Sequence, residues 1–122
     1  MSHIGLYWVH GRDAKPWGTK SQGLRDVAAE FGLEMLAPDF RGVMDPDQRV
    51  RMLVETIGDR PGPLVLVGSS MGGYVSTATC HELDVSRVFA LAPAFGLPGY
   101  RWQEFPWLQT PVEIVAGWRD AV

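Results

Sequence analysis

The fold is decided by one stretch, Leu64-Val65-Leu66-Val67-Gly68-Ser69-Ser70-Met71-Gly72-Gly73-Tyr74-Val75. Four apolar residues typical of a buried strand lead directly into the pattern Gly-x-Ser-x-Gly, and a helix-forming stretch follows. A strand, a sharp turn and a helix in this order predict a nucleophile elbow, with Ser70 at the tip of the turn. Gly68 and Gly72 flank the turn because a Cβ there would collide with the neighbouring strand or helix. The alternative interpretation is an ordinary glycine-rich strand-to-helix turn.

Two backbone features of this turn favour nucleophilic chemistry. Ser70 is expected to hold a strained backbone conformation that exposes its hydroxyl. The backbone N–H of Met71 lies at the N-terminus of the predicted helix, where it can stabilise an oxyanion. The stretch therefore predicts Ser70 as a nucleophile and Met71 as one donor of an oxyanion hole.

Length and composition are those of a small soluble globular protein. The chain has 122 residues, of which 46% are hydrophobic and 20% charged, with a net charge of −3. This length predicts a single domain over residues 1–122. The charge gives no basic footprint for nucleic acid, and no apolar run is long enough to span a membrane. No secretory signal, metal-ligand cluster or cofactor motif is visible, so we expect a cytoplasmic protein without metal or cofactor.

The remaining sequence alternates short apolar strands with amphipathic helices. Strands are expected at residues 4–9, 33–37, 64–67, 87–91 and 112–116. This alternation predicts parallel strands joined by right-handed crossovers, with helices on both faces of the sheet.

Three helices are expected between these strands. Ser21 is the predicted N-cap of the first helix, and Gly32 ends it. Its apolar stripe, at helical spacing, consists of Leu24, Val27, Ala28 and Phe31. Asp45-Pro46 begins the second helix, and the third runs from Met71 to about Glu82.

Residues 92–111 interrupt the alternation. They hold four prolines, which disfavour a regular helix, and the aromatic residues Phe95, Tyr100, Trp102, Phe105 and Trp107. Aromatic side chains this dense need burial. Two interpretations stay open: the segment caps the end of the sheet as local core, or Trp102 and Trp107 line a substrate pocket above Ser70.

Five motifs, in order along the whole chain, resemble the α/β-hydrolase superfamily, especially its small bacterial members with little or no lid. The motifs are Tyr7-Trp8-Val9-His10-Gly11, Pro38-Asp39-Phe40-Arg41-Gly42, Gly68-Ser69-Ser70-Met71-Gly72-Gly73, Leu91-Ala92-Pro93 and Val115-Ala116-Gly117-Trp118-Arg119-Asp120. The resemblance implies an α/β fold: a three-layer α/β/α sandwich with five parallel strands in the spatial order 2-1-3-4-5.

The resemblance also implies a role for individual residues. Ser70 matches the nucleophile, and Arg12, which follows Gly11 of the substrate pocket, matches the second backbone donor of the oxyanion hole. Asp120 matches the acid that orients the catalytic histidine. The implied reaction is hydrolysis of an ester or related acyl bond in a small molecule. The Arg12 side chain could also pair with an acidic substrate, the alternative being a solvated arginine beside Asp13.

The histidines depart from the family pattern. The family places its catalytic histidine well beyond the acid, whereas this sequence runs two residues past Asp120 and holds only His3, His10 and His81. None is expected to act as the base for Ser70. Three explanations stay open: a truncated core of a longer hydrolase, a base supplied in trans, or a catalytically silent binding or scaffold protein. A truncated core leaves the fifth strand as an open edge, through which a homodimer is expected.

Overall fold

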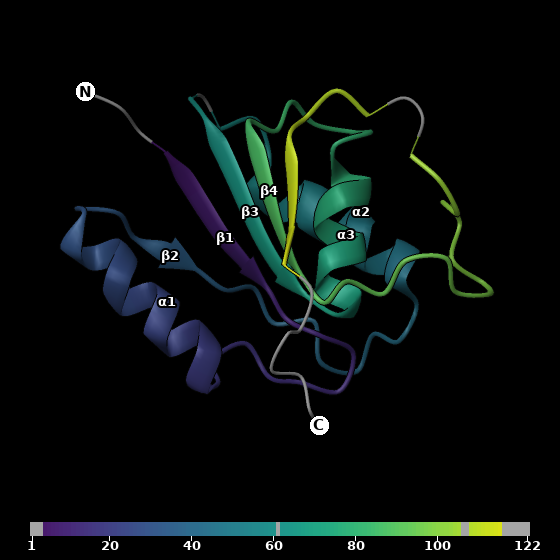
Figure 1. Cartoon of the computed structure of the whole chain (residues 1–122), viewed down its shortest axis with the longest axis horizontal. Helices are drawn as coiled ribbons and strands as arrows, with labels where there is room; N and C mark the ends of the chain where they lie inside the picture. The colour runs from purple at the N-terminus through teal and green to yellow at the C-terminus, as the bar shows by residue number, and fades with distance from the viewer. Residues whose placement is uncertain (1–3, 61, 106–107, 116–122) are drawn as a thin grey trace.

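A five-stranded parallel sheet forms the centre of the molecule (Figure 1). The computed structural model describes residues 4–60, 62–105 and 108–115. Its elements are β1 (Gly5–Val9), α1 (Thr19–Glu30), β2 (Met35–Leu36), α2 (Pro46–Ile57), β3 (Leu64–Ser69), α3 (Met71–Thr79), β4 (Arg87–Leu91) and β5 (Val112–Val115). The strands lie in the order β2-β1-β3-β4-β5, and each neighbouring pair is parallel. The predicted sheet and its strand order are therefore confirmed.

Helices cover both faces of the sheet, as Figure 1 shows. Along β1, Leu6 and Trp8 belong to the apolar cluster beneath α1, whereas Tyr7 and Val9 belong to the cluster with α2 and α3. This alternation follows from the period of two residues in a strand. The arrangement is the expected three-layer α/β/α sandwich. None of the helices in the described part of the chain has the length and apolar character to cross a membrane.

The start of α1 differs from the prediction. Gly18, not Ser21, is the N-cap, and the helix begins at Thr19. The Ser21 hydroxyl lies in the first turn, where it accepts from the Gly18 N–H (2.8 Å) and donates to the Pro16 carbonyl (3.0 Å). The serine therefore does stabilise the helix start, but from inside the helix.

The predicted apolar stripe of α1 is only partly buried. Ala28 is 8% exposed, whereas Val27 is 51% and Phe31 76% exposed. The reason is the sheet edge: β2 has only two residues, shorter than the strand predicted over residues 33–37. Few strand residues are left for this side of the helix to cover. The third helix is also shorter than predicted: it ends at Thr79 rather than at about Glu82.

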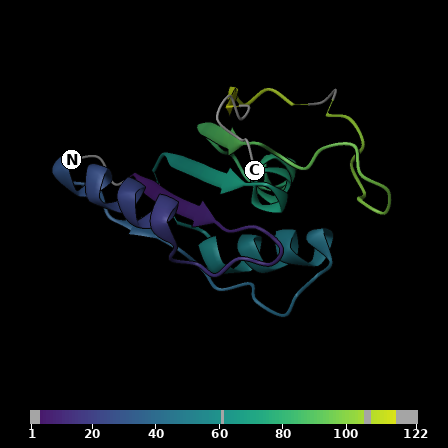
Figure 2. The ribbon, with the colours of Figure 1, turned by 60° about the horizontal axis from the view of Figure 1, so that its bottom comes forward.

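The described part of the aromatic segment, residues 92–105 and 108–111, is tied to α2 and α3 by a polar network. The Tyr74 hydroxyl donates to Asp47 Oδ1 (2.6 Å) and accepts from the Trp102 N–H (3.0 Å), while Asp47 Oδ2 accepts from the Arg101 N–H (2.9 Å). Burial and the bond to Asp47 raise the pKa of Tyr74. In Figures 1 and 2 this described part runs along the outer side of α3. Phe95, Tyr100, Trp102 and Phe105 pack against the core there, as the local-core interpretation predicts.

Candidate active site

Ser70 lies at the carboxyl end of β3, between the strand and α3. Its φ of 55° and ψ of −118° fall in a region that non-glycine residues rarely adopt. Such a conformation costs on the order of 1–3 kcal/mol and persists only where the surroundings hold it. Here the Ser70 N–H donates to the Leu91 carbonyl, and the Ser70 carbonyl accepts from the N–H groups of Gly73 and Ala94, each at 3.0 Å. The turn is thus fixed by β4 and the residues after it, and Ser70 is exposed.

The two flanking glycines are required by close backbone contacts. A Cβ on Gly68 would collide with the Gly72 carbonyl and lie 2.7 Å from Ser76 Oγ. A Cβ on Gly72 would collide with the Val9 carbonyl. No L side chain fits at either position without moving a strand or the helix.

The loop after β1 passes directly beside Ser70. A Cβ built on Gly11 would lie 3.4 Å from the Ser69 carbonyl oxygen and 3.6 Å from Ser70 Cβ. Met71 is the first residue of α3 and is buried. The structure therefore brings together four of the predicted site residues: Ser70, Met71, Gly11 and Arg12.

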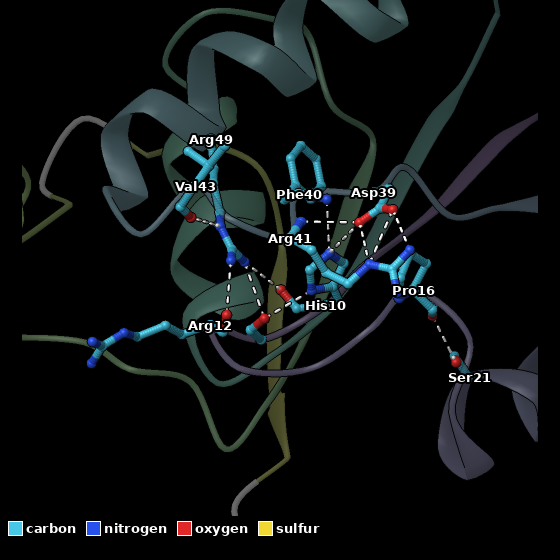
Figure 3. A network of polar contacts seen from close by, with 10 residues as sticks. His10, Arg12, Pro16, Ser21, Asp39, Phe40, Arg41, Val43 and Arg49 are labelled. Carbon is cyan, nitrogen blue, oxygen red and sulfur yellow. Dashed lines mark hydrogen bonds and ion pairs between the residues drawn. The ribbon is translucent and has the colours of Figure 1, made fainter.

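A buried arginine, Arg49 of α2, holds this loop in place (Figure 3). Its Nη1 donates to the carbonyls of His10 (3.2 Å) and Gly11 (3.1 Å), and its Nη2 donates to the Arg12 carbonyl (3.0 Å). Its Nε donates to the Val43 carbonyl at 2.6 Å. Within the described residues no carboxylate forms an ion pair with Arg49. Carbonyl oxygens therefore offset the cost of burying this charge.

The Arg49 contacts also set the direction of a neighbouring amide. In a trans peptide the C=O and N–H groups point in opposite directions. Since the Gly11 carbonyl points at Arg49, the N–H of Arg12, which belongs to the same peptide, points away from it. The role of Arg49 was not predicted from the sequence. The available signal was its spacing with Leu53 and Ile57, which puts a cation on the buried face of a helix.

His10 is a structural residue of the same loop. It is fully buried, and its Nε2 accepts from the Phe40 N–H at 2.8 Å. The proton is therefore assigned to Nδ1, which donates to the Gly11 carbonyl at 2.8 Å. Burial lowers the pKa of His10, which favours this neutral form. Both ring nitrogens are occupied, so His10 cannot take a proton from Ser70.

Other predicted site residues lie elsewhere. Trp102 does not line the cavity at Ser70: it lines a second cavity with residues of α2, and its ring packs 4.7 Å from His81, beyond the end of α3. The bond from the Trp102 N–H to Tyr74 holds it there. Asp120 and Trp107 lie outside the described residues.

A cavity of about 460 Å³ opens beside Ser70. It is bordered by the loop after β1 and by the start of α1, through residues 10–15 and 18–21, with Trp8 and Ser69. The exposed serine, an adjacent cavity and the N-terminus of a nine-residue helix thus meet at the carboxyl end of the sheet. Ligands of open α/β sheets bind at this end.

The chain belongs to the alpha/beta hydrolase family, whose pattern matches residues 6–121. This match confirms the resemblance drawn from the five sequence motifs. A comparison with the curated proteins gave no significant match.

Three solved structures resemble the fold. A protein described as a hydrolase of the alpha/beta superfamily from Xanthomonas campestris pv. campestris aligns with a TM-score of 0.78 and 24% identity, over 95% of this chain and 71% of that one. A pyrethroid hydrolase aligns with a TM-score of 0.59 and 19% identity, over 76% of this chain and 40% of that one. A phospholipase from Legionella pneumophila aligns with a TM-score of 0.58 and 16% identity, over 75% of this chain and 25% of that one. These structures show the same fold, and the family match supports a hydrolase lineage.

Proposed function

We propose that the protein is a serine hydrolase in which Ser70 attacks an ester or related acyl carbonyl of a small molecule. The observation that carries the proposal is the strained, exposed Ser70 between the loop after β1 and the N-terminus of α3. Three backbone hydrogen bonds maintain this strain. Strain of this kind at an exposed serine, beside a cavity, is typical of a nucleophile elbow.

In the proposed reaction, Ser70 Oγ bonds to the carbonyl carbon while its proton passes to a base. The carbonyl π electrons move onto the oxygen, and collapse of this intermediate expels the leaving group, which takes the proton. Water then hydrolyses the acyl-enzyme. We assign the developing oxyanion to the N–H groups of Met71 and Arg12, because Met71 begins α3 and Arg12 follows the glycine beside Ser70. One such donor contributes about 2.7–4 kcal/mol.

The base must come from outside the described residues. His10 has both ring nitrogens engaged, and His81 lies beyond the far end of α3. We propose that Asp120 orients a histidine outside the described residues, as the family pattern implies. A second candidate function, a catalytically silent binding or scaffold protein, is favoured by the same observation on the two histidines.

A covalent probe separates the two candidates. The protein is incubated with a neutral fluorophosphonate, and its intact mass is measured before and after. A serine hydrolase gains one adduct, the Ser70→Ala variant gains none, and the matched control Ser69→Ala still reacts. An unlabelled wild-type protein, or an adduct that persists in Ser70→Ala, would contradict the proposal and favour the binding protein.

A further inference from the structure

The cavity beside Ser70 concentrates positive charge. Three cationic residues line it, Arg12, Lys15 and Lys20, against one carboxylate, Asp13. Lys15 and Lys20 are also the only lysines of the sequence. The chain as a whole carries a net charge of −3, so the local balance is opposite in sign to that of the whole protein.

These charges are not neutralised by neighbouring carboxylates. Within the described part of the chain, Arg12, Lys15 and Lys20 form no ion pair, and the first turn of α1 contains no acidic residue. Arg12 Nε donates to the thioether sulfur of Met44 at 3.5 Å. All three cationic residues and Asp13 are exposed to solvent.

A nearby cation shows the contrast. Arg41 lines an adjacent cavity of about 570 Å³, which shares Arg12 and Lys15 with the first. Its guanidinium is bound to Asp39 at 2.6 Å, and hydrogen bonds from Arg41 lower the pKa of Asp39 to about 2. Arg41 is therefore already paired, whereas Arg12, Lys15 and Lys20 have no ion-pair partner among the described residues.

We propose that this cavity prefers acyl substrates that carry a negative charge, as a carboxylate or a phosphate, over neutral esters of the same size. The inference rests on the proposed function, because it names the substrate class of the same site. Cations that line a concave surface focus their field into it and raise the local concentration of anions. Lysine and arginine both bind carboxylate and phosphate oxygens by charge-assisted hydrogen bonds.

A binding experiment tests this selection without needing turnover. The protein is titrated with monomethyl succinate, which is charged, and with dimethyl succinate, which is neutral, while the amide NMR signals of Gly11 and Ser70 are followed. We expect the charged ester to bind more tightly by roughly three- to tenfold. The preference should fall as salt is raised, because exposed charges are screened. Equal affinity for the two esters would overturn the proposal.

Variants locate the effect. The double variant Lys15→Gln/Lys20→Gln should lose the preference, whereas Arg51→Gln, which removes an exposed charge from α2 outside this cavity, should keep it. A loss of equal size in Arg51→Gln would overturn the proposal, because the effect would then follow net charge. Competition with acetate and with inorganic phosphate shows which anion the cavity prefers, and failure of both to displace monomethyl succinate would contradict an anion site.

The two proposals fail in different ways. A protein that reacts with a neutral fluorophosphonate at Ser70 but binds both succinate esters equally retains the hydrolase and loses the anion selection. A protein that prefers the charged ester but forms no adduct retains an anion-binding cavity and loses the serine hydrolase.

Discussion

Arg49 links the buried face of α2 to the backbone of the candidate site. Replacing it with methionine keeps much of the side-chain volume but removes the guanidinium donors from the carbonyls of His10, Arg12 and Val43. Unpaired buried polar groups cost about 1–3 kcal/mol each. We therefore expect Arg49→Met to lower the free energy of unfolding by about 2–4 kcal/mol, measured by urea denaturation, and to slow phosphonylation of Ser70.

Two variants serve as controls for Arg49. Arg51→Met removes an exposed arginine of the same helix. It should change the free energy of unfolding by no more than about 0.5 kcal/mol and leave the labelling rate of Ser70 unchanged. Arg49→Lys retains the charge, but a single ammonium cannot reproduce the guanidinium fork, so it should recover only part of the labelling rate. If Arg49→Met behaved as Arg51→Met does, the assigned role of Arg49 would be wrong.

His10 predicts a pH dependence of stability. Burial holds its pKa below the ordinary value of 6.5, so below that pH the unfolded chain binds a proton that the folded protein does not. The stabilisation is fully present above pH 6.5 and is lost as the pH falls toward the lowered pKa, by at most about 1.4 kcal/mol per pH unit. Urea denaturation between pH 7 and 5 should therefore show a shallower decline in His10→Gln than in the wild type. An equal slope in both proteins would contradict a neutral, buried His10.

For individual residues, the sequence predicted those that belong to a local motif. It did not predict residues whose role depends on contacts with distant parts of the chain. The turn geometry at Ser70, Gly68 and Gly72 could be predicted because strand, turn and helix are adjacent in the chain. Arg49 was missed because its role depends on carbonyls nearly 40 residues away, which have no sequence signature.

The turn between β3 and α3 makes a prediction at the scale of elements. Gly72→Ala should lower the free energy of unfolding by about 3 kcal/mol or more, because the new methyl group would collide with the Val9 carbonyl of β1. Gly23→Ala is the matched control: it lies in α1 with nothing within 4 Å of the added Cβ, and should raise stability by about 0.5–1 kcal/mol. Thermal denaturation of both variants tests this, and a Gly72→Ala protein as stable as the wild type would contradict the close packing of the elbow.

The alternation of strands and helices was enough to predict the parallel sheet. It did not predict where each strand and helix ends. β2 has two residues, Met35 and Leu36, where a strand over residues 33–37 was predicted. The position of Arg101 and Trp102 depends on Tyr74 and Asp47, which lie far from them in the sequence. Their contacts place Trp102 over α2 rather than beside Ser70.

At the scale of the whole molecule, β5 is an edge of the sheet. In the described chain it pairs only with β4, and Ile114 and Val115 are 57% and 44% exposed. We propose that two copies associate through this edge, since unpaired strand edges and exposed apolar side chains favour strand addition. Light scattering at micromolar concentration should give the mass of a dimer.

A charge on the edge strand tests this association. Ile114→Lys should give a monomer, and Met44→Lys, at a residue of similar exposure outside the sheet, should remain a dimer. A wild-type protein that is monomeric at this concentration would contradict the proposed dimer.

The most direct test of the central claim is a crystal structure of the protein after reaction with a fluorophosphonate. We predict a bond between phosphorus and Ser70 Oγ, with the phosphonyl oxygen within about 3 Å of the backbone nitrogens of Met71 and Arg12. An adduct on another residue, or a phosphonyl oxygen that faces away from these two N–H groups, would contradict the assignment of this turn as the catalytic centre.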